Sequence, residues 1–341
     1  MALGSHRIGE AGANVSSLGL GCAPLGNLYR AITDTNATSL LAKAWQGGIR
    51  YFDTAPLYGF GLSERRLGQF LKQHPREEFA VSTKVGRRLT KNIGWHPQRE
   101  FFIDADPLEP IDDYSYEGVL ASVDESLERL QLTSIDILLM HDIGEATHGA
   151  MHEKVFEEAM SGGLRAMIEL REQGTVKAIG IGVNEWQVCD LAMAHADWDC
   201  FLLAGRYTLL EQEPLNGFFD RCAENNIDLI LGGVFNSGIL ATGTASDAKY
   251  DYGAAPASLK ARVQALNEVC LTHGVVMPAA AMQFPAAHPG IASIVAGLGT
   301  PSEVAVALEN FQAPIALEFW IDLKKAGLLP EKAPTPIGVH A

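Results

Sequence analysis

The sequence is poor in cysteine, basic residues and long apolar runs, and each shortage excludes a class of protein. Its five cysteines form no Cys-x-x-Cys pair and are odd in number, which argues against a disulfide framework and favours a reducing compartment. No apolar run approaches the ~18 residues of a membrane helix, and no signal-peptide pattern opens the chain. The 26 Lys and Arg against 41 Asp and Glu give a net charge of -15, which repels nucleic acids and anionic membranes. We therefore expect a cytoplasmic protein with neither of these partners.

The rest of the composition is typical of a globular enzyme-sized domain. Hydrophobic residues make up 47% of the chain and charged residues 20%, which is enough apolar side chain for a large core. A length of 341 residues is ordinary for one α/β barrel. We expect a single domain over residues 7–341 and leave the first six residues out of the fold prediction. No heptad repeat indicates an oligomeric state, and no metal site is expected.

Short apolar runs recur at intervals that suit alternating strands and helices. The segments between them carry apolar residues at helical spacing, for example Val119, Val123, Leu127 and Leu130. Strands that alternate with helices form a parallel sheet, and eight of them close as a (β/α)8 TIM barrel. The eight runs cover residues 18–22, 49–52, 79–83, 135–140, 178–183, 200–203, 227–231 and 291–296.

Two long polar segments interrupt this alternation, and an apolar tail follows it. Residues 86–114 come after the third run and residues 236–255 after the seventh. Both segments leave the C-terminal face, where barrels keep their active sites, so we interpret them as cofactor or substrate loops, with mere insertions as the alternative. The tail after residue 311 has the pattern of an amphipathic helix that caps the barrel.

Four titratable residues are expected to meet on one rim of the barrel. Asp53, Lys84 and His141 each follow an apolar run directly, and Tyr58 lies five residues beyond Asp53. Each has an ordinary alternative, such as a helix cap, a surface ion pair or a turn. Their convergence is nevertheless typical of an active site, and we call these four residues the tetrad.

The chemistry of these side chains suits proton transfer. A tyrosine with an ordinary pKa near ~10 transfers protons poorly at neutral pH, and a nearby lysine ammonium lowers that pKa by favouring the phenolate. Lys84 can supply the ammonium, and Asp53 can supply the carboxylate that a buried ammonium requires. His141 can donate to the phenol or to a substrate oxygen, or exchange a proton with it.

Residues 53–68 read Asp-Thr-Ala-x-x-Tyr-Gly-x-Gly-x-Ser-Glu-x-x-Leu-Gly, and this motif resembles that of the aldo-keto reductases. The resemblance extends over about residues 8–311 and implies the catalytic tetrad of that family, with Tyr58 as general acid and base. It also implies a nicotinamide cofactor held across the barrel mouth. Ser63 and Glu64 are expected to serve structure, with Ser63 capping the following helix and Glu64 facing the positive end of its dipole.

The same resemblance implies where the cofactor lies. Asn184 follows the fifth run, where the family holds the nicotinamide carboxamide, and the role of the neighbouring Glu185 is left open. Tyr207 follows the sixth run, and its ring is expected to stack on the nicotinamide. After the seventh run come Gly232, Gly233 and Val234, whose backbone amides are expected near the pyrophosphate.

The segment after the eighth run bears on the choice between NAD and NADP. Gly297 and Glu303 lie there, and Glu303 stands about where NADP-preferring relatives in the family carry an arginine. A carboxylate repels a 2'-phosphate but accepts hydrogen bonds from free ribose hydroxyls. The sequence therefore predicts NAD, with NADP disfavoured.

Three short phrases indicate the substrate class. Residues 183–186, 206–211 and 235–238 are similar to the family branch of L-fucose, L-galactose and D-threo-aldose 1-dehydrogenases, and pyridoxal 4-dehydrogenase is similar to that branch too. The shared reaction is oxidation of a cyclic hemiacetal to its lactone. Trp95, Asp142 and Trp320 are candidate substrate contacts, with Asp142 equally suited to capping a turn.

Other functions stay open at this stage. A general aldehyde or ketone reductase fits the same tetrad, and so does a non-catalytic subunit of the kind that accompanies certain potassium channels. A lyase or aldolase with Lys84 as Schiff-base amine fits less well, because Asp53 would raise the pKa of a lysine that must lose its proton.

Overall fold

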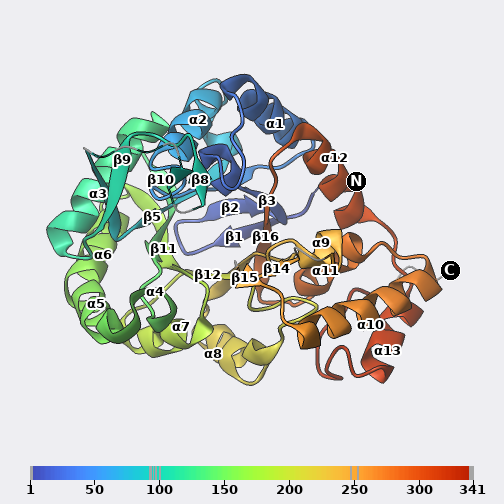
Figure 1. The fold of residues 1–341 in the computed structure, drawn as a ribbon. Helices are drawn as coiled ribbons and strands as arrows, with labels where there is room; N and C mark the ends of the chain where they lie inside the picture. The colour runs from blue at the N-terminus through green and yellow to red at the C-terminus, as the bar shows by residue number, and fades with distance from the viewer. Residues whose placement is uncertain are drawn as a thin grey trace.

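A computed structural model of the chain describes residues 3–91, 94, 96, 98–99, 101–245, 248–251 and 253–337. Its parallel strands close into a barrel in the order β10-β11-β12-β13-β16-β3-β4-β5. In Figure 1 these strands form an inner ring, and the helices surround it. The predicted (β/α)8 TIM barrel is confirmed.

Each of the eight predicted apolar runs overlaps one barrel strand. The strands are β3 (Leu18–Gly21), β4 (Tyr51–Asp53), β5 (Ala80–Val85), β10 (Ile135–His141), β11 (Val176–Val183), β12 (Cys200–Ala204), β13 (Asp228–Gly232) and β16 (Ile291–Gly297). All residues of β4, β5 and β10 are buried. Helices cover the outside of a closed parallel sheet, so its strands are apolar on both faces and read as continuous hydrophobic runs.

The outer layer is formed by amphipathic helices that follow the strands. In α3, a stripe that includes Val119, Val123 and Leu130 is buried, and the hydroxyl of Ser115 caps the helix by accepting from the amide of Gly118. The helices that follow successive barrel strands are α1 (Asp34–Gln46), α2 (Leu62–Leu71), α3 (Tyr116–Leu130), α6 (Leu164–Glu172), α7 (Trp186–Ala192), α8 (Phe218–Glu224), α11 (Met277–Ala286) and α12 (Pro301–Gln312). The additional helices are α4 (Glu145–His148), α5 (His152–Glu158), α9 (Ile239–Thr242), α10 (Ala257–His273) and α13 (Leu317–Lys325).

An N-terminal hairpin closes the end of the barrel where the strands begin. Strands β1 (Ser5–Ile8) and β2 (Ala13–Ser16) pair antiparallel, and Ile8, Ala13 and Val15 are buried in one cluster with side chains of the barrel interior. His6 Nε2 lies 2.8 Å from a carboxylate oxygen of Asp228, the first residue of β13. Figure 1 shows this hairpin at the centre of the ring. It was not predicted, because its four-residue strands contain no apolar run, and β1 begins before residue 7, where the predicted domain starts.

The two long segments contain more regular structure than predicted. In the first, β6 (Arg87–Lys91) pairs with β9 (Leu108–Asp112) and β7 (Gln98–Arg99) with β8 (Phe102–Ile103), all antiparallel. In the second, α9 precedes a short pair of β14 (Lys249–Tyr250) and β15 (Gly253–Ala254). These strands are short and mostly polar, so the sequence pattern does not distinguish them from loop.

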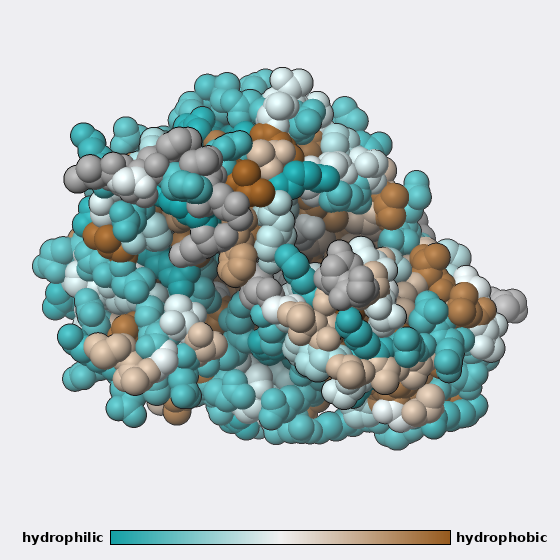
Figure 2. Space-filling model, in the orientation of Figure 1, coloured by the Kyte–Doolittle hydropathy of each residue, from teal (hydrophilic) through white to brown (hydrophobic). Residues whose placement is uncertain are grey.

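The tail forms the predicted helix α13, which packs against α10 beside the barrel. On the face in Figure 2, hydrophilic residues predominate and apolar ones form small separate groups. Within the described ranges, no single helix has the length and apolarity of a membrane span. Helices α10 and α11 reach that threshold only together, and they meet at a bend of 100°. The five cysteines are buried free thiols.

Candidate active site

The tetrad residues meet at the C-terminal end of the barrel strands. Asp53 ends β4, Lys84 lies near the end of β5, and Tyr58 follows β4 in a turn. The Nζ of Lys84 lies 2.9 and 3.0 Å from the two carboxylate oxygens of Asp53 and 3.1 Å from the phenol oxygen of Tyr58. A fourth contact, of 2.8 Å, joins Nζ to the carbonyl of Thr54. One ammonium therefore bridges the carboxylate and the phenol.

Burial makes this bridge electrostatically strong. The side chains of Lys84 and Asp53 are only 2% and 5% exposed. Burial alone would lower the pKa of Lys84, but the charge of Asp53 and the contact with Tyr58 outweigh it and raise that pKa above its ordinary value. Lys84 therefore keeps its proton, which supports the ammonium role and counts against a Schiff-base role.

Neighbouring side chains fix Asp53 and Tyr58 in position. The hydroxyl of Ser82 donates to Asp53 Oδ1 at 2.7 Å and bonds the phenol of Tyr51 at 2.9 Å. The backbone of Tyr58 packs directly on Gly26, where a Cβ atom would lie 2.5 Å from the Tyr58 carbonyl carbon. Glycine is thus required at position 26 by close approach.

Ser63 and Glu64 have hydrogen-bond partners other than those predicted. The hydroxyl of Ser63 donates to the carbonyl of Cys22 at 2.7 Å, and Gly61 rather than Ser63 stands at the N-cap of α2. The carboxylate of Glu64 is fully buried and accepts from Thr83 Oγ1 and from Arg129 Nε, both at 2.6 Å. It therefore ties α2 to β5 and α3 beside Lys84, so its role is structural, as predicted, by another route.

His141 completes the group as a neutral imidazole. Its ring lies edge-on to that of Tyr58, with centroids 6.2 Å apart. Burial and then the positive charges of Arg87 and Lys84 lower the pKa of His141 well below its ordinary value. Tyr114 fixes the backbone here by donating to the His141 carbonyl at 2.6 Å. A neutral imidazole can donate to a substrate oxygen from one nitrogen and accept at the other.

A cavity of about 240 Å³ opens above Tyr58 and His141, and we call it the substrate cavity. Its polar wall is formed by Arg87, Asp142 and Asn184, and its apolar wall is formed by hydrophobic side chains. These apolar lining residues include Leu28, Leu57, Phe101 and Phe102. The first long segment thus supplies lining residues, as predicted.

Arg87 is a lining residue that the sequence did not reveal. It lies in β6, and its Nη2 is 3.3 Å from Asp142 Oδ2. The residue before it, Gly86, has a φ of +102°, and that turn directs β6 toward the cavity. An arginine within a polar stretch gives no signal of this direction, which depends on the turn.

Asp142, Asn184 and Glu185 do not all lie in the same part of the site. The sequence had left the roles of Asp142 and Glu185 open. Asp142 and Asn184 line the substrate cavity, whereas Glu185 turns away and accepts from the amide of Ala146 at 3.0 Å, at the start of α4. Burial raises the pKa of Asp142, and the charges of Arg87 and Lys84 oppose that rise. Glu185 therefore caps a neighbouring helix and is not a cavity residue.

A second cavity of about 490 Å³, the cofactor groove, shares Tyr58 with the substrate cavity and extends toward α12. The predicted residues Gly232, Gly233, Gly297 and Glu303 line it. A Cβ at Gly297 would stand 3.9 Å from the nearest atom and would fill part of the groove, which is the open backbone that a dinucleotide requires. These residues therefore fit a nicotinamide cofactor.

The outer end of the groove carries one cation that the sequence did not indicate. Arg30 lines the groove, and its Nη2 lies 3.7 Å from Glu303 Oε1. The other oxygen of Glu303 accepts from the amide of Gly299 at 2.7 Å, and Thr300 Oγ1 accepts from the amide of Glu303 at 3.1 Å. Thr300 thus caps α12, while Glu303 binds the backbone just before the cap and faces the groove.

Two predicted site residues lie elsewhere, and one lies outside the described residues. The ring of Tyr207 is 1% exposed and packs among Phe219, Phe284 and His288, so it does not stack in either cavity. Trp320 is fully buried against Phe284 and Phe319. Val234 follows Gly233 with its side chain in the core, and the role of its backbone amide stays a prediction. Apolar side chains at these positions gain more from burial in the core than from exposure at the cavity rim. Trp95 falls outside the described residues.

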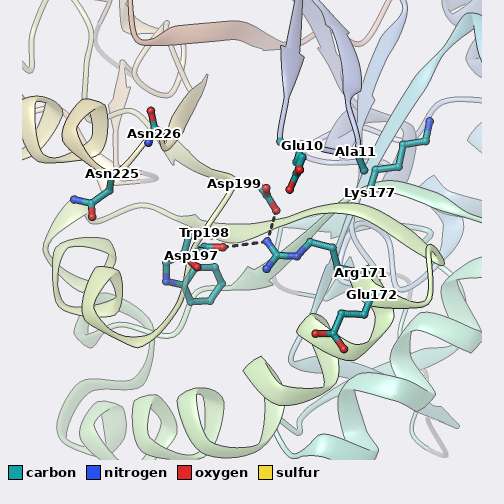
Figure 3. Close-up of a pocket in the computed structure, with 11 residues that line it drawn as sticks. Glu10, Ala11, Arg171, Glu172, Lys177, Asp197, Trp198, Asp199, Asn225 and Asn226 are labelled. Atoms are coloured by element: carbon teal, nitrogen blue, oxygen red, sulfur yellow. Dashed lines mark hydrogen bonds and ion pairs between the residues drawn. The ribbon is translucent and has the colours of Figure 1, made fainter.

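A third cavity lies at the opposite end of the barrel. It measures about 740 Å³ and is lined by residues at or just before the starts of the strands, among them Arg171, Lys177 and Asp199. Figure 3 shows Arg171 directed at Asp199, at 2.7 Å, and at a backbone carbonyl. Lys177 pairs with Asp136 at 2.7 Å. Both cations of this cavity lining are therefore held in ion pairs that link neighbouring barrel elements. In the described part of the chain, no group of three His, Cys, Asp or Glu side chains is placed to hold a metal ion.

Comparisons with known proteins identify the family and agree with the barrel fold. The model of the Aldo/keto reductase family matches residues 17–327. The chain is 41% identical to pyridoxal 4-dehydrogenase of Microbacterium luteolum over 94% of its own length and 97% of that protein. It is 40% identical to D-threo-aldose 1-dehydrogenase of a Pseudomonas species, over 94% and 96%. An aldo-keto reductase from Bacillus halodurans in its holo form superimposes with a TM-score of 0.73 at 23% identity, covering 98% of each chain.

Proposed function

The chain belongs to the aldo/keto reductase family, and from that membership we propose that it oxidises the C1 hydroxyl of a cyclic hemiacetal to a lactone with NAD. The observation that carries the proposal is the ammonium of Lys84, which joins Asp53 to the phenol of Tyr58 at the floor of the substrate cavity. The preferred substrate is an aldose such as L-fucose, L-galactose or a D-threo-aldose.

Tyr58 acts as the base in this direction. Its phenolate takes the proton of the anomeric hydroxyl. Before that transfer the phenol oxygen is negatively charged, and the ammonium of Lys84 at 3.1 Å stabilises this charge. Asp53 holds the ammonium in place, and neutral His141 holds the substrate oxygen by a hydrogen bond. Gly232, Gly233 and Gly297 would hold NAD in the cofactor groove, where it would supply the acceptor for the hydride of the anomeric carbon. The anomeric hydroxyl loses its proton to Tyr58, and its C–O bond becomes the lactone carbonyl.

Residues of the two cavities support NAD as the cofactor. Gly232 and Gly297 leave open backbone for the dinucleotide in the groove, and Asn184 lines the adjoining substrate cavity with Tyr58 and His141, from which we propose that it binds the carboxamide. Glu303 places a carboxylate at the outer end, which disfavours a 2'-phosphate. The roles of these residues follow from their positions along the two joined cavities.

Pairing of the cavity charges favours a neutral substrate with hydroxyl groups. Lys84 is matched by Asp53 and Arg87 by Asp142, so the lining charges are balanced. A cavity of about 240 Å³ suits a monosaccharide in its cyclic form. A free aldehyde or ketone needs fewer polar contacts than the polar wall of this cavity offers. A cavity whose charges are paired beside the tetrad favours a catalytic protein over an auxiliary subunit that binds no substrate.

One observation favours pyridoxal as the second candidate. Phe101 and Phe102 line the same cavity, and aromatic side chains stack well on a planar heterocycle. The cyclic hemiacetal of pyridoxal would react by the same steps and give 4-pyridoxolactone. The relative at 41% identity is a pyridoxal 4-dehydrogenase.

The test is NADH formation by the purified protein with NAD and, separately, L-fucose, L-galactose, D-arabinose and pyridoxal. We expect a signal with at least one sugar and its loss in Tyr58→Phe, which keeps the ring and removes the proton-transfer oxygen. Activity on pyridoxal alone would replace the substrate and keep the mechanism. Inactivity on all four hemiacetals would contradict the proposal.

A further inference from the structure

Arg87 and Asp142 form an ion pair in the wall of the substrate cavity, and it lies directly beside the tetrad. Asp142 Oδ2 is 3.3 Å from Arg87 Nη2 and 3.4 Å from His141 Nε2. The two side chains are 13% and 19% exposed, and both line the cavity together with Tyr58. A substrate held at Tyr58 and His141 would therefore have this pair beside it in the cavity lining.

Unusual backbone turns bring both residues to this position. Asp142 follows the last residue of β10 with a φ of 48°, and its amide donates to the carbonyl of Gly182 at 3.0 Å. Arg87 follows Gly86, whose φ is +102° and where a Cβ atom would lie 2.1 Å from the ring of Tyr114. Left-handed residues other than glycine are uncommon and cluster at functional sites. Asp142 is such a residue, and together with the glycine turn at Gly86 it places one charge pair just past Lys84 and His141.

The chemistry of the pair suits a hydroxyl group. Arg87 only donates hydrogen bonds and ionised Asp142 only accepts them, whereas a hydroxyl can do both at once. The exposed Asp112 is a second carboxylate near Arg87, at 3.8 Å, so the guanidinium stays charged and oriented. Leu28 and Leu57 on the apolar wall offer no competing side-chain partner. A hydroxyl on the polar side of the substrate has its donor and acceptor here.

We propose that Arg87 and Asp142 bind the substrate hydroxyl nearest the hemiacetal carbon and make the enzyme select substrates that carry it. This inference rests on the proposed function. In an aldose the group is the 2-hydroxyl, and in pyridoxal it is the 3-hydroxyl. The shared requirement explains how one cavity wall serves both substrate classes.

The test compares kcat/KM for the best hemiacetal with that for its analogue lacking this hydroxyl: the 2-deoxy sugar, or 3-deoxypyridoxal. For the unmodified enzyme we expect a preference of about 100-fold, since the analogue leaves buried charged groups without their partner. Arg87→Met and Asp142→Gly should reduce this preference to below about fivefold, mainly by lowering activity on the full substrate. Glycine is chosen at position 142 because it tolerates the φ of 48°.

Arg88→Met is the matched control. Arg88 is the next residue on β6, but it pairs with Glu125 at 2.6 Å and with Asp113 at 3.7 Å, outside the cavity. This variant should keep the full preference of the unmodified enzyme. Equal activity of the unmodified enzyme on both substrates would overturn the inference alone, as would variants that lose activity on both in the same proportion. Inactivity of the unmodified enzyme on every hemiacetal would overturn the proposed function and this inference with it.

Discussion

The ammonium of Lys84 lies 3.1 Å from the phenol oxygen of Tyr58 and 4.6 Å from the centre of its ring. Asp53 holds the opposite side of the ammonium at 2.9 Å. The charge that stabilises the phenolate is therefore fixed before any substrate arrives, at a point that side-chain motion cannot easily change.

Lys84→Met should lower kcat by about 100- to 10,000-fold, the range for loss of one acid–base element. The same change leaves the buried Asp53 unpaired, so the free energy of unfolding should also fall. The double variant Asp53→Asn, Lys84→Met should recover much of that stability but none of the activity. Steady-state kinetics and chemical denaturation measure the two effects, and recovery of activity in the double variant would contradict the proposed role.

His141 should make the protein less stable as the pH falls. Because burial and two cations lower its pKa, the unfolded chain binds a proton here near pH ~6.5 while the folded protein does not. This residue should therefore reduce the free energy of unfolding by about 1.4 kcal/mol per pH unit below that value, down to its folded pKa. The free energies of unfolding of the unmodified protein and His141→Gln should diverge in this window, and a constant difference between them would show that folding does not change the pKa of this histidine.

Glu303→Gln should weaken the preference for NAD over NADP. The amide oxygen can still accept from the amide of Gly299, so the start of α12 is preserved. Removing the like charge should raise kcat/KM with NADP by about fivefold, since two charges about 4 Å apart in water repel by about 1 kcal/mol. Glu309→Gln, on an exposed face of the same helix, is the control and should change neither cofactor. An unmodified enzyme that already prefers NADP would refute the assignment.

Arg129→Met should cost about 3–5 kcal/mol in the free energy of unfolding, because it leaves the fully buried carboxylate of Glu64 without its cation. Glu64→Gln in the same chain should restore more than half of the loss. Arg88→Met breaks the more exposed ion pair that joins Arg88 of β6 to Glu125 of the same helix α3, and it should cost about 1 kcal/mol or less. Denaturant titrations compare the three variants, and equal losses at positions 88 and 129 would contradict the argument.

The sequence predicted the barrel and the tetrad because both depend on local pattern. Each barrel strand is a continuous apolar run, and a residue that directly follows such a run must emerge at the strand's C-terminal end. Asp53, Lys84 and His141 satisfy this rule, and the turn that carries Tyr58 is too short to move it far. Convergence of the four followed from topology alone.

The rest of the site depends on directions that no local pattern encodes. Arg87 reaches the cavity through the left-handed turn at Gly86, and Arg30 approaches Glu303 from a segment more than 270 residues away along the chain. Tyr207 and Trp320 were expected to line the site, but the ring of each packs against aromatic side chains in the core. Apolar packing decided their direction, and packing requires the whole fold.

The hairpin of β1 and β2 covers the end of the barrel where the strands begin, opposite the tetrad. At the other end the substrate cavity and the cofactor groove share Ala23, Leu28, Tyr58, Leu202 and Ala204. A substrate bound on these residues would cover the inner end of the groove. For the proposed oxidation we therefore expect an ordered sequence, in which the dinucleotide binds before the hemiacetal and the lactone leaves before the reduced dinucleotide.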